Sequence, residues 1–94
     1  MPVDPSAVFK KNENAAYRVY DHQATVVMPD RAEVKVLNEI GSLVWGMIDG
    51  HRNVRQVVDA VLETVVNAYQ VSREEARRDI LEFLEVLREH GMVS

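Results

Sequence analysis

Apolar and polar residues alternate with a period of two in the first half of the chain. Such alternation is typical of strands that bury one face and expose the other. Polar breaks at 21–23 and 29–31 separate the runs, and Pro29 suits the second position of a type I turn. The pattern predicts a three-stranded antiparallel meander, which needs a covering layer to be stable. The predicted strands are Tyr17–Tyr20, Ala24–Met28 and Glu33–Leu37.

The second half of the chain changes to helical spacing, with apolar residues three and four positions apart. Each of three apolar stripes follows a residue that can cap a helix, namely Asn38, Asn53 and Ser72. Gln56 and Glu75 lie three residues after the last two caps, which predicts two capping boxes. The pattern therefore predicts three helices. The first is expected to end at Asp49-Gly50 and the third at His90-Gly91.

Strands followed by helices predict an α+β domain of order βββααα, with the helices on one face of the sheet. A chain of 94 residues fits one such domain. Residues 1–16 carry two prolines and little periodicity. We expect them to form a mobile N-terminal lead-in, with Val8 and Phe9 as docking points. Residues 17–94 are expected to form the folded domain.

The sequence contains no recognisable catalytic or metal-binding motif. The chain has no cysteine, which excludes disulfides and zinc ribbons and fits the cytoplasm. His22, His51 and His90 are far apart and lack metal-site spacing, and there is no Gly-rich phosphate loop or GxSxG elbow. No apolar run approaches the roughly 18 residues of a membrane span. We therefore expect a cytoplasmic protein that is not an enzyme, with no metal, no cofactor and no membrane partner.

Charge weighs against a nucleic-acid partner. Residues 1–37 hold five basic and five acidic residues, whereas residues 38–94 hold six basic and ten acidic. A nucleic-acid module usually carries a basic stripe on its reading element. The second predicted helix offers Arg55 against Asp59 and Glu63. A winged-helix DNA-binding regulator therefore remains only as an alternative.

An ordered set of short motifs runs from residue 37 to residue 93. The motifs are Leu37-Asn38, Trp45, Asp49-Gly50, Asn53-Val54, Asp79-Ile80, Phe83-Leu84, Leu87 and Gly91-Met92-Val93. Their order and spacing resemble the PqqD family, also called RiPP recognition elements. The strands resemble that family in pattern only, and Asn53 stands where the family more often has Thr or Ser.

This resemblance implies a winged-helix-like βββααα fold and a non-catalytic function. Members bind the leader segment of a ribosomally made precursor peptide and present it to a modifying enzyme, often a radical SAM protein. The pathway would be pyrroloquinoline quinone biosynthesis or another peptide pathway. A structural subunit that forms a homodimer through an exposed strand edge remains a further alternative.

The resemblance also implies where the peptide binds. Family members take the leader as an added strand on the edge of the third strand, beside the third helix. The residues implied here are Val34, Lys35 and Val36. The alternative is that both valines are ordinary core residues.

The third predicted helix has one apolar and basic border and one mostly acidic border. We expect the first border to face the leader, because an apolar floor with a charged rim suits a bound peptide. The alternative is a solvated face on which Glu74 and Glu85 neutralise the arginines. The leader-facing border consists of Arg77, Leu81, Leu84 and Arg88, and the opposite border of Glu75, Asp79, Glu82 and Val86.

Overall fold

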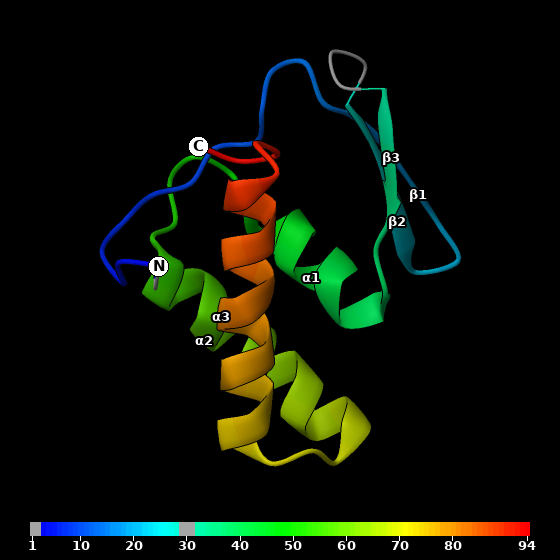
Figure 1. Ribbon diagram of the computed structural model, residues 1–94. Coiled ribbons are helices and arrows are strands. Elements are labelled where there is room, and N and C mark those ends of the chain that lie inside the picture. Colours follow the sequence, from blue (N-terminus) through cyan, green and yellow to red (C-terminus); the bar gives the residue numbers. More distant parts are fainter. Residues whose placement is uncertain (1–2, 29–31) are drawn as a thin grey trace.

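The computed structural model of the chain describes residues 3–28 and 32–94 (Figure 1). Three antiparallel strands precede three helices, which confirms the predicted α+β fold and its βββααα order. The strands are β1 (Ala16–Tyr20), β2 (Gln23–Met28) and β3 (Glu33–Val36), in the sheet order β1-β2-β3. The central strand is β2, so β3 lies at an edge of the sheet.

The turn between β1 and β2 has two residues. Tyr20 pairs with Gln23, and Asp21 and His22 between them have φ angles of 52° and 65°. Two successive positive φ angles define a type I′ turn, whose twist matches that of the flanking strands. Asp and His tolerate this left-handed conformation better than most residues. The second predicted turn, at residues 29–31, lies outside the described residues.

The two faces of the sheet differ sharply. In β2, Ala24, Val26 and Met28 are buried against the helices. Residues directly opposite each other in a ladder share a face, and Val34 pairs with Val27 rather than with a buried residue. Val34 and Val36 therefore lie on the outer face, and each is 64% exposed. The alternative that these two valines are core residues is wrong.

The three helices begin at the predicted caps. The Asn38 side chain accepts a 2.7 Å hydrogen bond from Gly41 N, and the Ser72 hydroxyl accepts one of 3.1 Å from Glu75 N. Asn53 and Gln56 form the complete capping box, with two bonds of 2.9 Å. The helices are α1 (Glu39–Met47), α2 (Val54–Tyr69) and α3 (Arg73–Glu89).

Helix α1 is the middle layer, since it packs against β2 on one side and against α2 and α3 on the other (Figure 1). Its Trp45 is 1% exposed and meets the Tyr17 ring edge-on, with centroids 5.4 Å apart. The Lys11 ammonium lies 5.3 Å from the Trp45 ring centroid. Gly41 lets α3 approach closely, because a Cβ there would sit 2.9 Å from the Phe83 ring. None of the helices in the described part of the chain is long and apolar enough to cross a membrane.

The segment before β1 packs along the end of the chain. Lys10 and Ser94 exchange two backbone hydrogen bonds of 3.0 Å, and Asn12 N donates to Met92 O at 2.9 Å. Phe9, one of the two predicted docking points, is 8% exposed, whereas Val8 is 43% exposed. Of the residues predicted as a lead-in, Val3 and Phe9 thus contribute to the core.

The first prediction concerns the stability of the fold. Trp45 and Leu84 should both contribute strongly to it, because both are buried in the core. Trp45→Ala and Leu84→Ala should each lower the free energy of unfolding by about 2 to 5 kcal/mol. The measurement is urea unfolding followed by circular dichroism. Val36→Ala serves as the control and should change stability by less than about 0.5 kcal/mol, because Val36 is exposed. A Trp45→Ala chain as stable as the control would contradict this packing.

Candidate functional site: the open edge of β3

One hydrogen bond sets the direction of the backbone along β3. Leu37 N donates to Ala24 O of β2 at 2.8 Å. Backbone N–H and C=O groups alternate in direction along a strand, so those of Lys35 also point toward β2. Those of Val34 and Val36 point to the open edge. The edge therefore offers the donors and acceptors of two residues to an additional strand.

Side chains of both kinds flank this edge. Val34 and Val36 lie on the outer face, whereas Glu33 and Lys35 lie on the face that carries the helices. Lys35 stands opposite Val26, which is fully buried. Within the described ranges, no ion pair or hydrogen bond engages the Lys35 ammonium. An additional strand would thus meet apolar side chains on one face and charged side chains on the other.

The end of α3 reaches the beginning of β3. His90 Nδ1 lies 2.8 Å from Glu33 Oε1, and the two side chains are partly exposed. Phe83 and Val86 share a helix border with His90, because the three are three and four residues apart. The Phe83 ring lies against Gly41 of α1. This border of α3 therefore faces α1 and the sheet.

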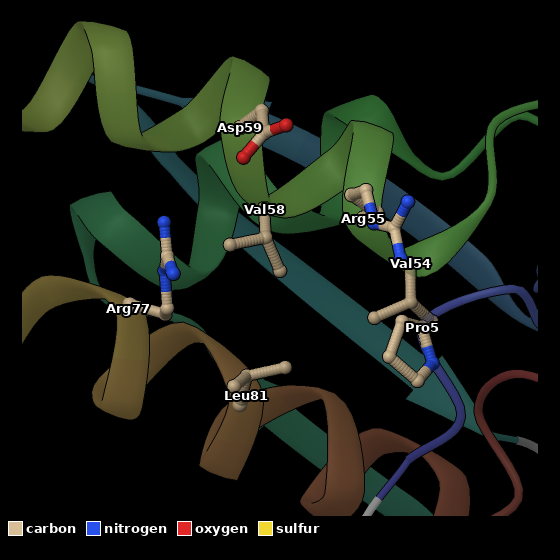
Figure 2. Close-up of a pocket in the computed structure, with 7 residues that line it drawn as sticks. All are labelled: Pro5, Val54, Arg55, Val58, Asp59, Arg77 and Leu81. Carbon is tan, nitrogen blue, oxygen red and sulfur yellow. The ribbon is translucent and has the colours of Figure 1, made fainter. Parts of the chain in front are cut away.

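The structure places Arg77 and Leu81 in a different site. They line a cavity of about 260 Å³ between α2 and α3, together with Pro5 of the N-terminal segment (Figure 2). Figure 2 shows both side chains pointing toward α2. Arg77 and Leu81 thus lie on a side of α3 that faces α2. The remaining lining residues are Val54, Arg55, Val58 and Asp59.

Leu84 and Arg88 complete the predicted border. Leu84 is fully buried and supports the core, so a peptide could touch it only after neighbouring side chains move. Arg88 is half-buried in the last turn of α3. The helical wheel predicts that these residues share one side of α3. It could not show that this side faces α2, because a periodicity carries no information on which neighbour covers which border.

The groups whose pKa values are shifted lie away from β3, and hydrogen bonds or burial cause the shifts. Backbone N–H groups of Arg52 and His51 lower the pKa of Asp49, which caps the loop between α1 and α2. Burial lowers the pKa of Lys11, whose amine donates to Ile48 O at 2.8 Å. Within residues 3–28 and 32–94, no three His, Asp or Glu side chains gather as a metal site would require. The groups with shifted pKa values therefore do not mark a site at β3.

A three-stranded antiparallel sheet with β3 at one edge, backed by three helices, defines a class of small α+β domain. The chain belongs to the PqqD family, since the sequence profile of coenzyme PQQ synthesis protein D matches residues 24–93. A comparison with curated proteins gave no match.

Two solved structures share the fold. The first, lasso peptide synthetase B1 complexed with the leader peptide, is 25% identical with a TM-score of 0.75, and the alignment covers 94% of this chain and 99% of that one. The second, TbiB1 in complex with the TbiA(beta) leader peptide, is 16% identical with a TM-score of 0.73. The alignment covers 90% of this chain and 94% of that one.

The backbone directions along β3 give the second prediction. Val34→Pro should leave the fold intact, because it removes an N–H that points to the open edge. Lys35→Pro should unfold or strongly destabilise the domain, because it removes an N–H that points to β2. Thermal melting of both variants is the measurement. Equal destabilisation by the two prolines would mean that the assigned directions are wrong.

Proposed function

We propose that this protein captures the leader of a ribosomally made precursor peptide as an additional strand on β3. The observation that carries the proposal is the open backbone of Val34 and Val36 beside the end of α3. Adding a strand to an exposed edge is an established mode of peptide recognition. The relative that is 25% identical is named as a complex with a leader peptide, which supports the same function here.

The proposed peptide strand uses both faces of the edge. Hydrogen bonds to Val34 and Val36 give affinity that depends little on sequence. Side chains directed toward the helices would meet the α3 border of Phe83 and Val86, because His90 on that border contacts Glu33 of β3. Val34, Lys35 and Val36 thus remain the proposed peptide contacts on β3. On α3, the proposed contacts move to the border opposite Arg77 and Leu81.

The proposed function is non-catalytic, and the chemistry belongs to a separate modifying enzyme. A binding domain of this kind accelerates modification by holding the peptide near the enzyme, which raises its effective concentration. A radical SAM protein is the proposed enzyme. The proposed location is the cytoplasm, where a precursor peptide leaves the ribosome. The comparisons give no support to the DNA-binding alternative.

Calorimetric titration with the cognate leader peptide is the test. Val34→Pro should reduce affinity at least about tenfold, because a backbone bond is lost. Val86→Asp should weaken binding by a similar factor or more, because it buries a charge against the peptide. Leu81→Asp, the matched change on the α2 side, should bind normally.

Thermal melting confirms that each variant is folded. Normal binding by Val86→Asp together with lost binding by Leu81→Asp would place the leader on the Arg77 and Leu81 side of α3.

A further inference from the structure

An open strand edge can pair with a second copy of itself as well as with a peptide. Only one antiparallel register of two β3 strands uses all the outward backbone groups, with Val34 of each copy opposite Val36 of the other. A register centred on Val34 would require Ala32 to pair with Val36 of the other copy, but the φ of 51° takes Ala32 out of the strand. A register centred on Val36 would require Asn38, which caps α1. Lys35 would therefore directly face its own copy.

Lys35 would occupy a non-hydrogen-bonded position in that pairing, because its own N–H and C=O point to β2. Opposite residues at such positions have Cα atoms roughly 4.5 Å apart and the closest side chains. Within the described residues, the neighbours of Lys35 on β2 carry no compensating charge: it faces Val26, with Ala24 and Met28 on the diagonals, and all three are buried. The acidic residue on its own strand, Glu33, contacts His90. Like charges that face each other in this way are destabilising.

We propose that Lys35 is the specificity-determining residue of the β3 edge. It repels a second copy of β3 and selects an extended peptide with a carboxylate directly opposite. The expected ligand is an antiparallel strand with an Asp or Glu between the two residues that hydrogen-bond Val34 and Val36. This inference rests on the proposed function, since it names the chemistry of the peptide that the edge takes.

Val34 and Val36 add a second feature to the ligand. The residues paired with them must lie on the outer face of the extended sheet, where the valines are 64% exposed. Apolar and β-branched partners pack best against such cross-strand neighbours. The preferred segment therefore has an acidic residue flanked on both sides by residues such as Val, Ile or Thr.

Two synthetic peptides test the inference without knowledge of the natural leader. One copies residues 32–38, and the other carries the Lys35→Glu change at its centre. Both are titrated into ¹⁵N-labelled protein, and the amide shifts of residues 33–36 are followed. The acidic peptide should bind about tenfold more tightly than the native copy. The net charge of −4 on the protein opposes this preference, so it would reflect the local contact.

The reciprocal variant is the decisive control. The Lys35→Glu protein should bind the native peptide more tightly than the acidic one. Lys10→Glu makes the same charge change on the N-terminal segment, and this protein should still bind the acidic peptide more tightly. Sedimentation should show each of wild type and Lys35→Glu as a monomer and their equimolar mixture as a heterodimer at high concentration. If the Lys35→Glu protein still prefers the acidic peptide, the proposed role of Lys35 is wrong, but the edge can still be the peptide site. Peptides that leave residues 33–36 unperturbed would overturn the edge as a peptide site as well.

Discussion

The hydrogen bond from Leu37 to Ala24 is the constraint on which the functional edge depends. It fixes which residues of β3 turn their backbone toward β2 and which turn it outward. A shift of one residue would move Val34 and Val36 to the inner face and expose the backbone of Lys35 and Glu33. The burial of Leu37 at 3% exposure helps to hold the register, because a shift of one residue would bring the smaller Val36 or the polar Asn38 into that position.

The α1 layer gives this register its support. Trp45 and Val44 are buried on α1, and the hydroxyl of Ser42 accepts a 2.7 Å hydrogen bond from Ala24 N of β2. Ala24 is thus held on its N–H side by α1 and on its C=O side by Leu37. The sheet has only three short strands and would be marginal alone. Its edge can remain open because α1 stabilises the strand next to it.

Much of the fold could be predicted from local patterns, because caps and periodicities are local. Asn38, Asn53 and Ser72 begin the helices as expected, and the three strands lie within one residue of their predicted bounds. The packing of residues 3–15 could not be predicted, since their partners are distant in sequence: the start of α2 and the last residues of the chain. The side of α3 that faces β3 could not be predicted either. That side depends on the angle at which α3 crosses α1, which Gly41 and Phe83 set through tertiary contact.

The edge must satisfy two opposed requirements. It needs unpaired backbone groups to bind a peptide, yet the same groups invite pairing with other copies of the chain. Proteins commonly protect such edges with inward-pointing charges, and Lys35 has that position, opposite the buried Val26. A charge protects against self-pairing only because identical strands carry identical charges. A peptide with the opposite charge at the facing position turns the same repulsion into attraction, so one side chain can keep the edge free and define what occupies it.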